Sequence, residues 1–302
     1  MMRNRNLGKR LGIVVPWLVL IITPIMLFNY LVKGQVKSEM VSTGYKKVIV
    51  TGLDKAVANA LEGAKGNYGI FIKNLKTGET FKQNEHMTFH AGSLYKIWIM
   101  AETFDQIKTG DLTEDEQLSR DIDYLNKKFQ IAEENAELTE GVITLTVANA
   151  LTQMITISHN YAAMLLTEKI KLSSVAKFLK DNSFIESKVG INGEDPTTTP
   201  ADMEKFFEKL YKGEIIDQEY SNKMLELLKA QKLNNKLPKN LPTETIIAHK
   251  TGELGFYTHD GGIVYSPKGD YIIIVMSQSD SPPGAEERIV DISEAVYKYF
   301  SR

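Results

Sequence analysis

The placement of the predicted strands constrains this chain more than any other feature of its sequence. Two strand patterns, Tyr68–Lys73 and Thr80–Lys82, lie near its beginning. Three more follow only at 245–249, 262–266 and 271–278. A strand is stable only when it is paired, so the early and the late strands must pair with each other. The sequence therefore predicts an α/β (α+β) fold in which one antiparallel sheet receives a long insertion.

Helical spacing of apolar residues accounts for most of the remaining sequence. Helices predicted at Asp54–Lys65 and 284–299 flank the sheet. The interval 111–231 is expected to form an all-helical second lobe. Its helices are predicted at about 144–156, 160–170, 173–181, 200–212 and 217–231. We interpret the acidic stretch Asp111–Glu140 as a solvated helical face of that lobe.

Composition excludes several classes of function. Hydrophobic residues make up 43% and charged residues 25% of the 302 residues, which is typical of a globular protein. The 36 Lys and Arg against 38 Asp and Glu give a net charge of −2, so nucleic acid is not expected as a partner. Cysteine is absent, which excludes disulfides, thiolate metal sites and cysteine nucleophiles.

An uncharged stretch near the beginning indicates a membrane anchor. Residues 11–32 carry no charge over 22 positions, enough for a helix to span the hydrocarbon core. Basic residues dominate the preceding flank 1–10, which predicts a cytoplasmic N-terminus, a tether at 33–53 and an exported domain at 54–302. The alternatives are a cleaved signal peptide, although no Ala precedes Ala56 to form its usual cleavage site, and a buried soluble helix.

A serine and a lysine three residues apart open a strongly predicted helix. Ser93 and Lys96 begin the helix Ser93–Thr109, which is apolar on most sides and therefore expected to be buried. Residues at i and i+3 share a face, so the amine can lie beside the hydroxyl. A buried lysine loses basicity and can take the proton of a serine nucleophile. A second S-x-x-K at Ser174–Lys177 is interpreted as an ordinary helix surface.

Two further short patterns follow in the chain. Ser158-His159-Asn160 lies between two predicted helices, where Ser or Asn could also serve only as an N-cap. Lys250-Thr251-Gly252 follows the predicted strand 245–249. The same K-T-G triplet occurs at Lys76–Gly78, where it fits a hairpin turn, and at Lys108–Gly110, where it fits a helix C-terminus.

Taken together and in this order, the three patterns are far more specific than each alone. Residues from about 66 to 302 resemble the class A β-lactamase-like branch of the penicillin-recognising serine enzymes. Thr197–Pro200, Gly261–Val264 and the last helix are also similar to that family. The resemblance implies a sheet flanked by the terminal helices, a helical lobe and an active site in the cleft between them.

The resemblance also implies roles for individual residues. Ser93 would be the acylated nucleophile and Lys96 its base, while Ser158 would pass a proton to the leaving nitrogen. Lys250 would support that transfer and attract the substrate carboxylate. The substrate would be held by Asn160, Thr251, Gly252 and Glu253. The backbone N–H groups of Ser93 and Glu253 would form the oxyanion hole.

The chain departs from the family pattern at three places. The stretch Asn182–Pro196 is shorter than the corresponding family loop and lacks its Glu-x-x-Leu-Asn signature, so Glu186 is only a candidate deacylation base. His159 replaces the usual Asp, a change expected to be structural. No Arg follows Lys250 closely, and Thr258 and His259 occupy that neighbourhood.

We therefore expect a serine hydrolase that forms an acyl-enzyme with β-lactams or with D-Ala-D-Ala ends of peptidoglycan stem peptides. The missing Glu signature favours a DD-peptidase-like, penicillin-binding enzyme. The alternatives are a β-lactamase with an atypical deacylation base and a sensor that is acylated without turnover. No metal or cofactor is expected, since His86 and His90 lack an accompanying H-E-x-x-H pattern or third ligand.

Overall fold

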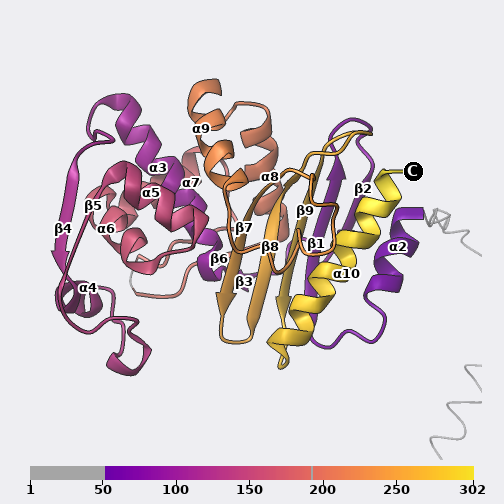
Figure 1. Ribbon diagram of the computed structural model, residues 1–302, viewed down its shortest axis with the longest axis horizontal. Coiled ribbons are helices and arrows are strands. Elements are labelled where there is room, and N and C mark those ends of the chain that lie inside the picture. The colour runs from indigo at the N-terminus through magenta and orange to yellow at the C-terminus, as the bar shows by residue number, and fades with distance from the viewer. Residues whose placement is uncertain (1–51, 192) are drawn as a thin grey trace, which may run out of the picture. The chain divides into compact units, whose positions relative to one another are not determined.

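The predicted antiparallel sheet is present in the computed structural model, which describes residues 52–191 and 193–302 (Figure 1). Its strands follow the order β2-β1-β9-β8-β7, and every neighbouring pair is antiparallel. They are β1 (Asn67–Asn74), β2 (Thr80–Gln83), β7 (Ile247–Leu254), β8 (Tyr257–Val264) and β9 (Tyr271–Gln278). The pairing of β1 with β9 confirms that strands from both ends of the sequence share one sheet.

Side chains of the central strand β9 alternate between two hydrophobic cores. Tyr271, Ile273 and Val275 pack on one face, against α2 (Gly52–Ala60) and α10 (Pro282–Phe300). Figure 1 shows these two helices side by side over the sheet. Ile272, Ile274 and Met276 belong to the core on the other face. Both faces of β9 are covered, which explains why its sequence is a continuous apolar run and does not alternate with polar residues.

The opposite face of the sheet carries α8 (Pro200–Tyr211), which contacts β1, β8 and β9. Thr199 caps this helix by accepting a hydrogen bond from the Asp202 N–H, as the Thr-Pro pattern predicts. The remaining helices are η1 (Gly92–Tyr95), α3 (Lys96–Thr109), α4 (Ile122–Lys128), η2 (Glu133–Asn135), α5 (Val147–Thr156), α6 (Asn160–Ile170), α7 (Leu172–Asp181) and α9 (Gln218–Lys229). The helical lobe is thus narrower than 111–231, because α8 lies on the sheet.

The prediction that the lobe is all-helical is wrong. Strands β4 (Gln117–Asp121) and β5 (Val142–Thr146) form an antiparallel ribbon within it. The β-branched sequence of β5 favours a strand, and its Thr144 hydroxyl shares a hydrogen bond with Ser119 across the pair. The following helix therefore begins at Val147 and not at 144. A second short pairing joins β3 (Phe89–His90) to β6 (Thr197–Thr198).

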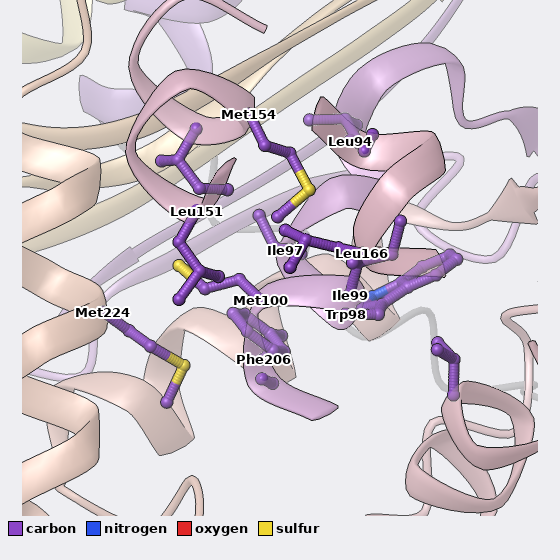
Figure 2. Packing of buried hydrophobic residues seen from close by; sticks show 14 of the residues in the cluster. Leu94, Ile97, Trp98, Ile99, Met100, Leu151, Met154, Leu166, Phe206 and Met224 are labelled. Atoms are coloured by element: carbon purple, nitrogen blue, oxygen red, sulfur yellow. The ribbon is translucent and has the colours of Figure 1, made fainter. Parts of the chain in front are cut away.

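The helix that follows Ser93 is buried as expected. All nine residues from Lys96 to Phe104 are inaccessible or nearly so. Figure 2 shows Ile97, Trp98 and Met100 packed among side chains of the neighbouring helices. A lysine at the start of this helix is therefore carried into the interior by its apolar neighbours.

The proposed membrane segment 11–32 and its flanks 1–10 and 33–51 lie outside the described residues. Among the helices that are described, none has the length and apolar character required to cross a membrane. Leu53, the last residue of the expected tether, lies within α2 and is fully buried.

A buried histidine makes the stability of this fold depend on pH. His259 on β8 accepts a hydrogen bond from the Ser277 N–H at Nδ1 and donates from Nε2 to the His90 carbonyl. Protonation of Nδ1 would remove the acceptor of the Ser277 N–H, so this arrangement requires the neutral ring. Burial lowers its pKa from 6.5 to about 4. Between these values the unfolded chain binds the proton that the folded chain excludes, so stability is complete above pH 6.5 and falls as pH drops towards 4.

We expect the free energy of unfolding to fall by about 3 kcal/mol on this account between pH 6.5 and 4. Urea unfolding of the chain at several pH values measures this fall. The His259→Gln side chain keeps a donor and an acceptor but cannot titrate. We expect this variant to be less stable than the original protein at pH 7, and its free energy of unfolding to fall less with decreasing pH below 6.5. If the free energy of unfolding depended on pH equally in the two proteins, this role of His259 would be contradicted.

Candidate active site

Ser93 lies on a tight helical turn beside a large cavity. It is the second residue of η1, whose first residue, Gly92, has a left-handed φ of 50°. Ser93 is half-buried and lines a cavity of about 830 Å³. No hydrogen bond joins its hydroxyl to any of the described residues. The nucleophile expected from the sequence is therefore accessible from the cavity.

Lys96 is fully buried next to this turn and is held by the S-x-N segment. Its Nζ donates to the Ser158 carbonyl at 2.5 Å, to Ser158 Oγ at 3.2 Å and to Asn160 Oδ1 at 2.7 Å. Burial lowers its pKa from 10.5 to about 7, while the charge of Glu137 acts in the opposite direction. Lys96 is thus a buried amine that can lose its proton near neutral pH.

The connection between α5 and α6 is shaped to present Ser158. This residue has a left-handed φ of 58°, which is unusual for a residue with a side chain. Its neighbour His159 caps α6 by accepting a hydrogen bond from the Ala162 N–H at 3.1 Å. A capping histidine in place of the family's Asp agrees with the expected structural role.

Lys250 approaches the same serine from the sheet. Its Nζ donates to Ser158 Oγ at 3.0 Å and to the Thr251 carbonyl at 2.9 Å. Burial and the charge of Lys96 together lower its pKa from 10.5 to about 7, with burial as the larger cause. The triplet Lys250–Gly252 lies within β7 and not after the strand, because β7 continues to Leu254. One Ser158 hydroxyl therefore accepts hydrogen bonds from two buried lysines.

Strand β7 also passes very close to the serine turn. A Cβ at Gly252 would lie 2.6 Å from the Ala91 carbonyl oxygen and 3.2 Å from the Leu94 nitrogen. A Cβ at Gly92 would lie 2.6 Å from the nitrogen of Glu253. Only glycine allows this approach. The backbone N–H of Glu253 is thus brought beside the turn that carries Ser93, as an oxyanion hole requires.

The structure adds a third buried lysine that the sequence analysis missed. Lys236 is 1% exposed, and its Nζ donates to Glu253 Oε1 at 2.6 Å. The next residue, Leu237, is fixed through its N–H to Asp260 Oδ2, and Asp260 also pairs with His249 on β7. A lysine in a polar stretch carries no sequence signal of burial. Its charge contributes to lowering the pKa of Lys250, and buried ammonium groups attract an anionic substrate.

Glu137 is a second site residue that the sequence analysis did not find. Its Oε1 accepts a hydrogen bond from Asn160 Nδ2 at 2.6 Å, and the residue lines the cavity. It belongs to the acidic stretch interpreted as a solvated helical face. The carboxylate therefore occupies the amide donor that the resemblance assigns to substrate binding.

The candidate deacylation base Glu186 is not brought to the cavity. Its carboxylate is bonded to His86 Nδ1 at 2.9 Å and to Thr199 Oγ1 at 2.6 Å, and its N–H donates to Asp202. The cavity is lined instead by the other glutamate of the same loop, Glu194.

The other K-T-G triplets and the second S-x-x-K pattern lie in a turn, at a helix end and on a helix surface. Lys76 lies in the β1–β2 turn, where the Asn74 side chain accepts its N–H. Gly110 ends α3 with a φ of 82°, and Lys177 pairs with Asp181 on the surface of α7. Within residues 52–191 and 193–302, no three His, Asp or Glu side chains are grouped to hold a metal.

The close approach of β7 to the serine turn predicts that Gly252→Ala impairs acylation. The added Cβ would push the strand from Ala91 and Leu94 and would displace the Glu253 N–H. We expect the rate of labelling by a fluorescent penicillin to fall by about 10²-fold. Gly284→Ala on α10 is the control, since its Cβ would meet only the exposed Ser281 side chain. Unchanged labelling in folded Gly252→Ala would contradict this arrangement.

Known proteins are similar to this chain over most of its length. The model of the β-lactamase enzyme family matches residues 52–300. The β-lactamase VEB-1 of Pseudomonas aeruginosa is 26% identical over 280 residues, covering 85% of this chain and 93% of its own. The solved structure of PBP-A superposes with a TM-score of 0.72 at 22% identity, covering 83% of this chain and 96% of PBP-A. A β-lactamase from Sphaerobacter thermophilus gives a TM-score of 0.72 at 23% identity, with 83% and 97% coverage. The chain belongs to the β-lactamase family of serine hydrolases.

Proposed function

We propose that this protein is a penicillin-binding enzyme of the DD-peptidase type. Its substrates would be D-Ala-D-Ala peptides, and β-lactams would acylate the same serine. The observation that carries the proposal is the fully buried Lys96, whose pKa is about 7 and whose amine lies among Ser158 and Asn160. A neutral amine beside an accessible serine is what serine acylation needs.

The residues allow a complete acylation step. Ser93 Oγ turns towards Lys96 and transfers its proton to the neutral Nζ while it attacks the substrate carbonyl carbon. The developing oxyanion is stabilised by the backbone N–H groups of Ser93 and Glu253. The C–N bond then breaks, and the leaving nitrogen takes the proton of Ser158 Oγ. Ser158 is reprotonated by one of the lysines that contact it, Lys96 or Lys250.

The sheet side of the site supports binding of an anionic leaving group. Both substrate classes carry a carboxylate next to the nitrogen that departs. Lys250 and Lys236 are buried cations near the serine turn, and Thr251 offers a hydroxyl on the same strand. The family's arginine is missing from the sequence after Lys250, and the nearby buried Lys236 is paired with Glu253.

Deacylation decides between the penicillin-binding and the β-lactamase activities. Glu186 is tied to His86 and Thr199 outside the cavity, which favours an acyl-enzyme that persists against water. One observation favours the alternative, since Glu194 lines the cavity and could act on a water molecule. A sensor that is acylated and stops would share the persistent acyl-enzyme but would not turn over peptides.

We expect a fluorescent penicillin to label the full-length chain covalently and to remain bound for hours. Labelled protein is followed on denaturing gels after the free penicillin is removed. Ser93→Ala should abolish the label, whereas Ser174→Ala, in the S-x-x-K pattern on α7, is the matched control and should not. Label on Ser93→Ala would exclude this serine as the nucleophile.

The lifetime of the penicillin label and the release of D-Ala from peptides distinguish the DD-peptidase, the β-lactamase and the sensor. Release of D-Ala from an acyl-D-Ala-D-Ala peptide supports the DD-peptidase, and its absence with persistent label identifies the sensor. Rapid loss of label with accumulation of hydrolysed penicillin identifies a β-lactamase. In that case Glu194→Gln should prolong the label and Glu186→Gln should not.

A further inference from the structure

The cavity beside Ser93 continues as a groove along the whole of α6. Six residues of this helix and its end line it: Asn160, Tyr161, Met164, Thr167, Glu168 and Lys171. Their spacing of three and four residues places them on one face of the helix. The groove therefore starts at the residue that binds Lys96 and runs to the junction of α6 with α7.

Two other segments line much of the rest of the groove. One is Lys128–Ile131, at and after the end of α4. The other is a short hairpin in which Lys188 and Thr197 exchange both backbone hydrogen bonds. A Cβ at Gly190 would lie 1.7 Å from the Glu194 carbonyl oxygen, so this hairpin turns back tightly.

The groove is lined by apolar side chains together with charged ones, among them Lys128, Glu137, Glu168, Lys171, Glu194 and Asp195. Phe129, Ile131, Met164 and Leu172 are only partly buried where they line it. Glu168 is neutralised by ion pairs with Arg120 and Lys128. At the far end Lys171 is exposed and forms no ion pair with a described residue. Lys171 also adopts a φ of 70° and ψ of 136°, a conformation that costs energy for a residue other than glycine.

The length of the groove corresponds to a short peptide. The 11 residues of α6 rise about 16 Å. An extended peptide spans about 3.3–3.6 Å per residue, so about five residues would reach from Asn160 to Lys171.

The orientation of the substrate follows from the two ends of the site. The leaving group and its carboxylate belong on the side of β7, where Lys250 and Thr251 lie. Asn160 contacts Lys96 from the start of α6, and the groove extends from it along that helix. We propose that this groove binds the peptide on the acyl side of the attacked carbonyl, and that Lys171 pairs with a carboxylate about five residues from it. The assignment rests on the proposed peptidase function and extends it to the length and charge of the substrate.

The test uses peptides of two to six residues that end in D-Ala-D-Ala. Each is made with an uncharged N-acetyl cap and with an anionic N-succinyl cap. Binding to full-length Ser93→Ala is measured by calorimetry, so that no turnover is required. Affinity should rise with length, and the succinyl cap should improve it about two- to fivefold only in the longer peptides, as expected for an exposed ion pair.

Lys171→Gln in the same background should remove the advantage of the succinyl cap. Lys180→Gln, an exposed lysine of α7 outside the groove, is the matched control and should keep it. Affinity independent of length, or a cap advantage that survives Lys171→Gln, would overturn the proposal. Penicillin labelling of the unmodified chain reports separately on the proposed function. Labelling without length dependence would reject the groove alone, and length dependence without labelling would reject the serine chemistry alone.

Discussion

The arrangement depends on the burial of two lysines around one serine hydroxyl. Removing an ammonium group from water is costly unless it is hydrogen-bonded. Lys96 and Lys250 satisfy this requirement through Ser158, Asn160 and backbone carbonyls, yet both have a pKa near 7. The fold thus holds a pair of amines that share protons at neutral pH. Such a pair can accept a proton from one serine and return it through another.

Packing of the elements that carry the lysines keeps their side chains in place. The apolar helix α3 carries Lys96 inwards because its neighbours fill the core between the sheet and the helices. Strand β7 carries Lys250, and its glycine lets the strand touch the serine turn. The buried His249–Asp260 pair fixes the segment that bears Lys236. Each lysine therefore belongs to a different part of the fold, and only the assembled structure brings their charges together.

The sequence predicted the sheet and most helices, because these have strong local signals. β9 is a continuous apolar run, and α3 ends at a glycine. The three short patterns locate Ser93, Lys96, Ser158 and Lys250 by chemistry and order. β4 was missed because an acidic, weakly periodic stretch resembles a solvated helix, and β5 because the predicted helix began at 144, within the strand. Lys236 and Glu137 were missed because their burial and contacts arise from long-range packing. Glu186 and Glu194 are equivalent in sequence, and only the turn of the loop distinguishes their positions.

The central claim is that Lys96 acts as a neutral base, and the pH dependence of acylation tests it most directly. The second-order rate of labelling by benzylpenicillin, measured on the full-length chain by stopped flow, should rise with pH and level off around pH 7. The rise reflects loss of one proton from the lysine pair. A rate that is independent of pH from about 5.5 to 8.5, or that still increases tenfold per unit above pH 9, would contradict the account.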